Sequence, residues 1–198
     1  MSPAVILASG SESRRRLLSA AGIEAKACKP NVDEEAMKAA FRAEGLTVRD
    51  QAMQLAEMKA IKVSQRERGL VIGGDQMLAL GDMAFDKPKD MEAARQHLRK
   101  LSGKDHILET AIVVCEDGAP VWRHLSRPRL TMRPLSEEFI DQYVERVGEP
   151  LLATVGAYQL EGLGAQLFSR VEGDYFSILG LPLLPLLDYL RVRDVLPT

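Results

Sequence analysis

Several charged side chains stand in surroundings that are unusual for a simply solvated charge. Three consecutive arginines, beginning at Arg14, follow a turn of small residues at positions 9–11. Asp75 follows an apolar run and two glycines, and Lys59 interrupts the apolar segment LAEMKAI. Guanidinium and ammonium groups bind phosphates, whereas carboxylates bind divalent cations or accept protons. The residue types therefore indicate a site that could hold a polyanion.

The segment around Arg14 has the pattern of an anion site. The run AVILAS predicts a buried strand, and a helix is predicted over residues 12–21, ending at Gly22. Free N–H groups at the helix start, the helix dipole and the hydroxyl of Ser9 favour an anion. Arg14 and Arg15 can form forked contacts with phosphate. The alternative is that these arginines form a solvated helix face.

Asp75 lies in the segment LVIGGDQMLAL, residues 70–80, which predicts a buried strand. An unpaired carboxylate in a core costs free energy or shifts its pKa. One interpretation is an aspartate at a strand end, whose oxygens accept hydrogen bonds from backbone donors. The other is a metal ligand or general base that its small neighbours expose to a ligand.

Other charged residues are candidates for a functional role only if the fold brings them near Asp75. Glu34 lies in the acidic segment PNVDEE, which is typical of a solvated loop but could help Asp75 to hold Mg²⁺ or Mn²⁺. Lys59 falls on the apolar face of a helix predicted over residues 48–68, where snorkelling is the alternative to a functional role. Lys87 precedes a proline, which fixes an extended backbone and hence the direction of the side chain.

These groups fit a triphosphate better than an acyl or glycosyl substrate. The sequence has no GxxxxGK[ST] motif, which argues against a P-loop kinase or ATPase. It also has no GxGxxG motif and no nucleophile elbow. The three histidines are scattered without zinc-ligand spacing.

The composition indicates one globular domain over residues 1–198, with two lobes. Hydrophobic residues make up 46% and charged residues 27% of the chain, as in globular soluble proteins. A net charge of −2 and an aromatic content of 5% argue against a nucleic-acid partner. Cys28 and Cys115 lack metal-ligand spacing and are predicted to be reduced cytosolic thiols. We expect no membrane partner, because the uncharged run at residues 178–187 is too short to span a bilayer and instead predicts a buried helix entered through proline.

The remaining pattern predicts a mixed α/β fold. A hairpin is expected at the Gly-Asp pair 81–82, and two long β runs joined by EDGAP are expected between residues 106 and 133. Ser136 is the expected N-cap of a helix that ends at Gly148. Further helices are predicted over residues 36–44 and 89–101.

Eight segments occur in the order and spacing of the Maf-like nucleoside triphosphate pyrophosphatases, which the chain resembles from about residue 4 to 190: LASGSESRRRLL, VDE, LAEMKA, IGGDQ, DKP, LRKLSGKDH, VGAYQLEGLGAQLF and EGDYFSILGLPL. The resemblance implies an elongated mixed β-sheet flanked by helices around a central cleft, similar to the inosine triphosphate pyrophosphatases. It implies hydrolysis of nucleoside triphosphates to the monophosphate and pyrophosphate with a divalent cation, Mg or Mn. It further implies a cytoplasmic enzyme and suggests a homodimer.

The family's functional residues can be carried over by position. The resemblance makes Asp75 the proton acceptor, places a divalent metal at Glu34 and Asp75, and assigns phosphate binding to Ser9, Arg14, Lys59 and Lys87. Three positions that resemble a specificity code depart from the commonest pattern: Ser13 replaces arginine, Gln76 replaces threonine and Glu161 replaces glutamine.

The combination of Gln76 and Glu161 resembles the pattern of the family branch associated with 7-methyl-GTP. A physical rationale is that a carboxylate can accept hydrogen bonds from guanine and favours the cationic methylated ring. That branch tends to have tryptophan at the position of Ser13, whose loss removes a stacking surface. Glu12 also departs from the usual proline. The alternatives are a pyrophosphatase that prefers dTTP and UTP, a house-cleaning enzyme for damaged purine nucleotides, and a nucleotide-binding regulator of septum formation that does not cut. The retained carboxylates and lysines favour hydrolysis.

Overall fold

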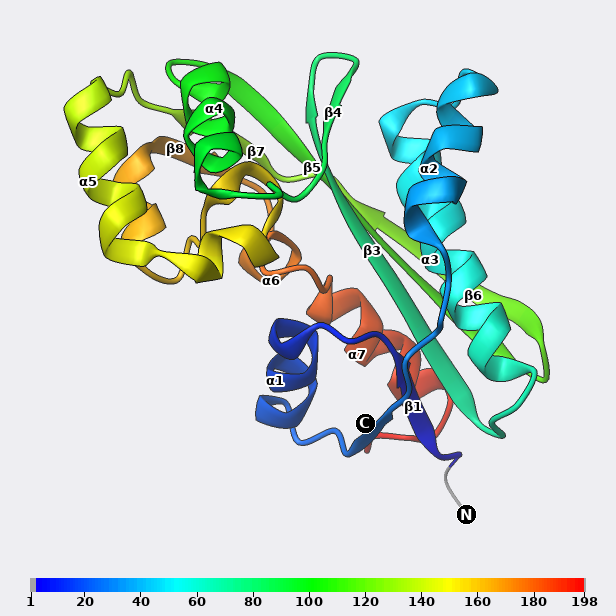
Figure 1. The fold of residues 1–198 in the computed structure, drawn as a ribbon. Coiled ribbons are helices and arrows are strands. Elements are labelled where there is room, and N and C mark those ends of the chain that lie inside the picture. Colours follow the sequence, from blue (N-terminus) through cyan, green and yellow to red (C-terminus); the bar gives the residue numbers. More distant parts are fainter. Residues whose placement is uncertain (1–2, 198) are drawn as a thin grey trace. The chain divides into compact units, whose positions relative to one another are not determined.

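The computed structural model describes residues 3–197, which divide into two compact units. The first unit contains the chain up to Gln76, then Thr110–Ser126, and the chain from Asp174 onward. The second unit contains Met77–Glu109 and Arg127–Gly173. Within the described residues, eight strands form one mixed sheet in the order β2-β1-β3-β5-β7-β8, with β4 paired to β3 and β6 paired to β5 (Figure 1). The predicted α/β class with a mixed sheet and surrounding helices is confirmed.

Parallel strands form the centre of the first unit. Strand β1 (Val5–Ala8) pairs in parallel with β2 (Ala25–Ala27) and with β3 (Leu70–Leu80). All four residues of β1 are buried, as are nine of the eleven residues of β3. Strands covered on both faces have continuous apolar sequences, which explains why both strands were recognisable in the sequence.

Three helices follow the first strands, and a polar side chain caps each of them. Helix α1 (Glu12–Ala20) begins after Ser11, α2 (Glu34–Ala43) after Asp33, and α3 (Val48–Ser64) after Thr47. Each capping side chain accepts a hydrogen bond from a backbone N–H of the first helical turn, which satisfies a donor that has no partner within the helix.

A close contact between α3 and β3 depends on Gly73. A Cβ atom at this position would lie 2.3 Å from the Ala56 carbonyl oxygen and 2.7 Å from the Ala60 nitrogen. The backbones of the helix and the strand can therefore approach each other only because residue 73 has no side chain. Lys59, which lies between these two contact points on α3, is thereby brought against β3.

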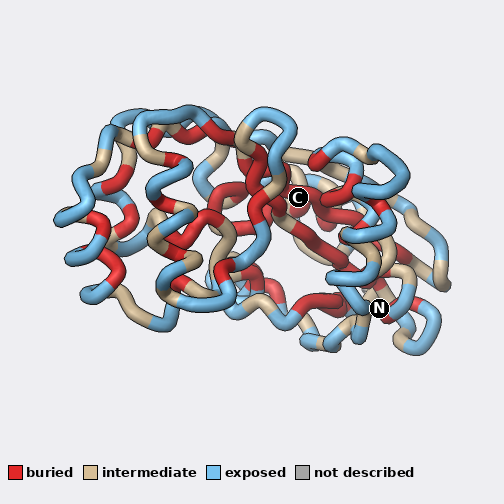
Figure 2. Tube along the Cα trace, turned by 45° about the horizontal axis from the view of Figure 1, so that its top comes forward, coloured by how far each residue is buried: buried red, intermediate tan, exposed pale blue. Residues whose placement is uncertain are grey.

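The C-terminal helix completes the core of the first unit. Helix α7 (Leu183–Val192) begins after Pro182 and follows the short helix α6 (Tyr175–Ile178), as the sequence predicted for a buried helix entered through proline. Figure 2 shows buried stretches in the interior of the trace and exposed residues on outer helical turns. One core cluster joins strand and helix residues: Val5, Leu7, Leu18, Ile23, Leu70, Ile72, Ile112, Val114, Leu181, Leu183, Leu186 and Leu190.

The β-rich segment after residue 105 contains three strands, and not the two long runs that were predicted. Strand β5 (Asp105–Glu116) pairs antiparallel with β6 (Ala119–Ser126) and with β7 (Arg129–Met132). The chain is interrupted at Pro128, which cannot donate to a strand ladder.

The second unit also contains elements without a clear sequence signal. Strand β8 (Phe168–Glu172) pairs with β7 and was not predicted, because four of its five residues are exposed. Strand β4 (Met83–Phe85) forms the predicted hairpin with β3, and Gly81 in its turn has a φ of +58°. Three short 3₁₀ helices, at Glu149–Ala153, Val155–Ala157 and Leu163–Leu167, lie between α5 and β8.

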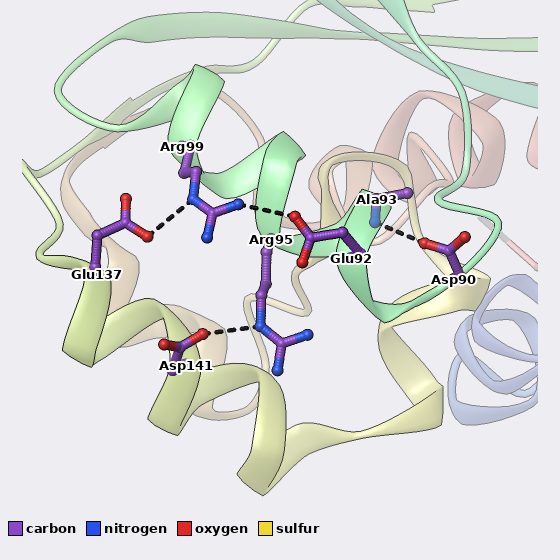
Figure 3. Close-up of polar contacts among 7 residues, drawn as sticks. All are labelled: Asp90, Glu92, Ala93, Arg95, Arg99, Glu137 and Asp141. Carbon is purple, nitrogen blue, oxygen red and sulfur yellow. Dashed lines mark hydrogen bonds and ion pairs between the residues drawn. The ribbon is translucent and has the colours of Figure 1, made fainter.

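Helices α4 (Met91–Leu101) and α5 (Glu137–Val147) of the second unit are linked by ion pairs on their exposed faces. Arg95 contacts Asp141 at 2.8 Å, and Arg99 contacts Glu137 at 2.9 Å (Figure 3). Exposed pairs of this kind contribute little to stability, so the buried residues of these helices hold them together. The predicted N-cap Ser136 is confirmed, since it accepts a hydrogen bond from the Phe139 N–H at 3.2 Å.

Two further predictions concern thiols and membranes. Cys28 and Cys115 are free cysteines, as expected. Among residues 3–197, no helix combines the length and the apolar character needed to cross a membrane.

Candidate active site

Lys59 is the centre of a charged cluster in the first unit. Its Nζ lies 2.6 Å from Asp75 Oδ1 and 2.8 Å from Glu34 Oε1, so that α2, α3 and β3 each contribute one residue. The side chains of Lys59 and Asp75 are only 7% and 8% exposed, whereas that of Glu34 is 45% exposed. The snorkelling interpretation of Lys59 is wrong, because its ammonium group is held inward by two carboxylates.

Asp75 has one carboxylate oxygen bound and one oxygen without a partner. It lies inside β3, not at the end, and Oδ1 accepts the hydrogen bond from Lys59. Oδ2 is buried and has no hydrogen-bond partner within residues 3–197. The interpretation of a strand-end aspartate satisfied by backbone donors is therefore wrong. A buried, unpaired carboxylate oxygen is unfavourable unless it accepts a proton or binds a ligand, which suits a functional group.

Arg14 is buried on α1 and points toward the same region of the first unit. Its Nε donates to the Gly180 carbonyl oxygen at 2.7 Å, and its Nη1 donates to Ser9 Oγ at 3.1 Å. A Cβ atom at Gly74 would lie 3.1 Å from Arg14 Nε, so the lack of a side chain at this one position of β3 makes room for the guanidinium group. Arg15 behaves differently: it is 60% exposed and pairs with Glu12 at 2.7 Å. The solvated-face interpretation is thus wrong for Arg14 and correct for Arg15.

Electrostatics link Arg14 to the carboxylates. Burial lowers the pKa of Arg14, while the charges of Asp75 and Glu34 raise it and offset part of that effect. An arginine remains protonated in proteins even so. Arg14 and Lys59 then balance the two carboxylates, which leaves the cluster formally neutral. A triphosphate bound here would bring excess negative charge, and a divalent cation would compensate for it.

The residues present fit a divalent metal bound together with a ligand, and not a metal bound by protein alone. The Asp75 carboxylate and the neighbouring Glu34 provide hard oxygen ligands. Within the described part of the chain, no group of three or more His, Cys, Asp or Glu residues could hold a metal ion. Mg²⁺ commonly uses one or two carboxylates, with waters and substrate phosphates as its other ligands, which is compatible with this donor set.

Three serines lie next to the start of α1, and one of them, Ser9, contacts the side chain of the arginine. Ser9 Oγ accepts hydrogen bonds from Arg14 and from the Ser11 N–H, the latter at 3.1 Å. Ser11 caps the helix, and its hydroxyl shares a hydrogen bond of 2.9 Å with that of Ser13. The side chain of Ser13 therefore lies at the helix N-terminus next to the cap.

Gln76, a predicted specificity residue, uses its amide group within the protein. Its Nε2 donates to Thr110 Oγ1 and to the Ser177 carbonyl oxygen, both at 2.9 Å, and to the Ile178 carbonyl oxygen at 3.2 Å. The sequence reasoning missed Thr110 and Gly180. A threonine in a β run has no distinguishing signal, whereas Gly180 before LPL could have been recognised as a turn glycine.

Lys87 and Glu161 lie in the second unit, and both are exposed. Their roles in phosphate binding and base selection remain predictions. The structure thus brings five of the predicted site residues together in the first unit: Ser9, Arg14, Glu34, Lys59 and Asp75.

A mixed α/β sheet that presents a buried arginine, a buried lysine and two carboxylates has the features of α/β proteins that bind phosphorylated ligands. The chain belongs to the Maf-like protein family, whose sequence profile matches residues 4–193. It is 72% identical over 198 residues to the nucleoside triphosphate pyrophosphatase of Hyphomonas neptunium, covering 100% of both chains. It is 54% identical over 195 residues to the protein of the same name from Rhodospirillum rubrum, covering 98% of this chain and 96% of that one. It is also 52% identical over 192 residues to the 7-methyl-GTP pyrophosphatase of Brucella abortus, covering 96% of each chain.

Proposed function

We propose that this protein is a hydrolase that converts nucleoside triphosphates to the nucleoside monophosphate and pyrophosphate. Membership of the Maf-like family and the names of relatives that match 96–100% of the chain support this activity. The observation that carries it is the unpaired Asp75 Oδ2, buried beside Lys59 and within the electrostatic reach of Arg14.

In the proposed reaction, Asp75 Oδ2 accepts a proton from a water molecule whose oxygen attacks the α-phosphorus. The bond between this phosphorus and the oxygen that bridges to the β-phosphate breaks, and pyrophosphate leaves. Lys59 holds Asp75 through Oδ1, which leaves Oδ2 as the oxygen that can take the proton. Arg14, with Ser9 as its neighbour, binds the phosphate groups. Glu34 and Asp75 would hold Mg²⁺ or Mn²⁺, which when bound would stabilise charge on the leaving group.

We propose 7-methyl-GTP as the preferred substrate, with dTTP and UTP as the alternative. Relatives carrying the name 7-methyl-GTP pyrophosphatase support the first choice. In this proposal, Glu161 accepts hydrogen bonds from the guanine edge and favours the positive charge of the methylated ring. Gln76 is kept as a specificity residue in this proposal, and its Nε2 donates to Thr110 and to backbone carbonyl oxygens.

We further propose that the enzyme acts in the cytoplasm as a homodimer, without a nucleic-acid partner. The resemblance to the family supports the first two proposals, and the net charge of −2 supports the third. Light scattering of the purified chain tests the homodimer directly.

A competition assay tests the activity and the base preference together. The purified protein is incubated with Mg²⁺ or Mn²⁺ and with equal concentrations of 7-methyl-GTP, ITP, dTTP, UTP and CTP. Pyrophosphate is measured by a coupled assay and the monophosphates by chromatography. We expect equal amounts of both products and the fastest turnover with 7-methyl-GTP. Binding of these nucleotides without any pyrophosphate release would contradict hydrolysis and favour the nucleotide-binding regulator of septum formation.

A further inference from the structure

A buried turn in the first unit determines where Arg14 is held. The Ser177 carbonyl oxygen accepts three hydrogen bonds: from the Gly180 N–H at 3.0 Å, from Thr110 Oγ1 at 3.0 Å and from Gln76 Nε2 at 2.9 Å. Ser177 and Thr110 are both fully buried. This single carbonyl oxygen therefore joins the turn at residues 177–180 to β3 and to β5.

The opposite end of the same turn contacts the arginine. The Gly180 carbonyl oxygen accepts the hydrogen bond from Arg14 Nε at 2.7 Å. Gly180 has a φ of +101°, a conformation that favours glycine, so the direction of this carbonyl group depends on the turn geometry. The Ser9 hydroxyl provides the other hydrogen bond to the guanidinium group, at 3.1 Å. A displacement of the turn would therefore move one of the two groups that orient Arg14.

The hydrogen-bond directions at Thr110 are determined by its partners. A carbonyl oxygen can only accept, so the Thr110 hydroxyl donates its proton to Ser177, and its oxygen accepts from the Gln76 amide at 2.9 Å. The hydroxyl thus both donates and accepts a hydrogen bond. Because Thr110 is fully buried, there is no room for a water molecule to take over these hydrogen bonds. Removing the hydroxyl takes away one of the three hydrogen bonds to the Ser177 carbonyl oxygen and one of the three acceptors of the Gln76 amide, and with them the direct link from β5 to the turn.

We infer that Thr110 is a positioning residue for phosphate binding, which acts by holding the turn that orients Arg14. This inference rests on the proposed function, in which Arg14 binds the phosphate groups. Thr110 itself need not touch the substrate. Because phosphate groups are common to all nucleoside triphosphates, the loss of this support affects every base by the same factor.

The test compares Thr110→Val, which removes the hydroxyl at nearly constant volume, with Thr110→Ser, which retains it. Small misplacements of binding groups cost up to about 10²-fold, so we expect T110V to raise KM about tenfold for 7-methyl-GTP, ITP and UTP alike, with kcat within about twofold. T110S should restore KM to within about twofold of the original chain. Thr131→Val, a strand substitution in the second unit, is the matched control and should leave KM unchanged.

A binding measurement separates positioning from a general structural role. The affinity for inorganic pyrophosphate, measured by calorimetry, should fall about tenfold in T110V and recover in T110S. Arg14→Ala should also weaken it, and the double variant should be no weaker than R14A alone, because the two residues act through one contact. Thermal unfolding reports whether T110V is folded, and Thr110→Ala replaces it in the same comparisons if it is not.

The outcomes distinguish this inference from the proposed function. Absence of hydrolysis in the original chain would overturn the proposed function, while pyrophosphate binding would still test Thr110. An active original chain together with a folded T110V of unchanged pyrophosphate affinity would overturn the positioning role. An effect of T110V on KM for one base alone would also overturn it, since it would assign Thr110 to base selection.

Discussion

Asp75→Asn tests the general base, because asparagine keeps the shape of the side chain and removes its ability to accept the proton. A positioned general base typically contributes about 10²–10⁴-fold to a rate. We therefore expect kcat to fall by that factor, which corresponds to a barrier higher by about 3–5 kcal/mol.

The structure indicates that this variant remains folded. Removing one partner of a buried ion pair lowers the free energy of unfolding by about 3–5 kcal/mol, because the other charge is left buried without a partner. In the variant, however, Lys59 keeps Glu34 at 2.8 Å, and the amide oxygen of asparagine can still accept from Lys59. We expect a loss near that of one hydrogen bond to a charged group, about 1.5–3 kcal/mol. This is smaller than the free energy of unfolding of a typical domain, about 5–15 kcal/mol.

The assay measures pyrophosphate release at saturating 7-methyl-GTP with Mg²⁺ or Mn²⁺, and urea unfolding gives the stability of the same preparation. Asp82→Asn, a change at an exposed residue of the β3–β4 hairpin, is the control and should match the original chain in both measurements. Loss of a general base lowers kcat by far more than about threefold. A folded D75N variant whose kcat lies within about threefold of that of the original chain would therefore refute the role of Asp75 as proton acceptor.

Three further perturbations address the neighbours of Asp75 and the second unit. Lys59→Met leaves the buried Asp75 carboxylate without its cation and should lower the free energy of unfolding, measured in urea, by about 3–5 kcal/mol. An unchanged free energy of unfolding would mean that water solvates the carboxylate. Gly74→Ala places a methyl group 3.1 Å from Arg14 Nε and should raise KM equally for all triphosphates in steady-state kinetics; a change confined to one base would contradict this. Burial lowers the pKa of His106 from 6.5 to about 4, so its contribution to stability is complete above about pH 6.5 and is lost as the pH falls toward 4. Urea unfolding between pH 7 and 4.5 should show a weaker pH dependence in His106→Gln, and an unchanged dependence would exclude His106 as its source.

Elements with local signals could be predicted from the sequence. The Ser136 cap and the Gly81 hairpin are both observed, because a cap or a tight turn is determined by a few consecutive residues. Strand β8 could not be predicted, since its side chains are mostly exposed and its pairing with β7 depends on residues far away in the sequence. The break at Pro128 could have been recognised from the proline alone.

The candidate site was predictable as a set of residue types but not as a geometry. The sequence left open whether Lys59 snorkels and whether Asp75 accepts backbone hydrogen bonds. Packing of α3 against β3 at Gly73 answers both questions, because it places the ammonium group beside the carboxylate in the interior. Sequence spacing contains no such information, since the helix could have presented another face.

By itself, the sequence determined the membership of the Maf-like family, the α/β class and the residues able to bind phosphate or accept a proton. Only the tertiary structure decided which of them meet. Arg14 is oriented by Gly180, which lies 166 positions away along the chain, and three separate elements supply the cluster around Lys59. The physical reason is that caps, turns and apolar runs depend on neighbouring residues, whereas a buried ion pair exists only where packing removes both partners from water.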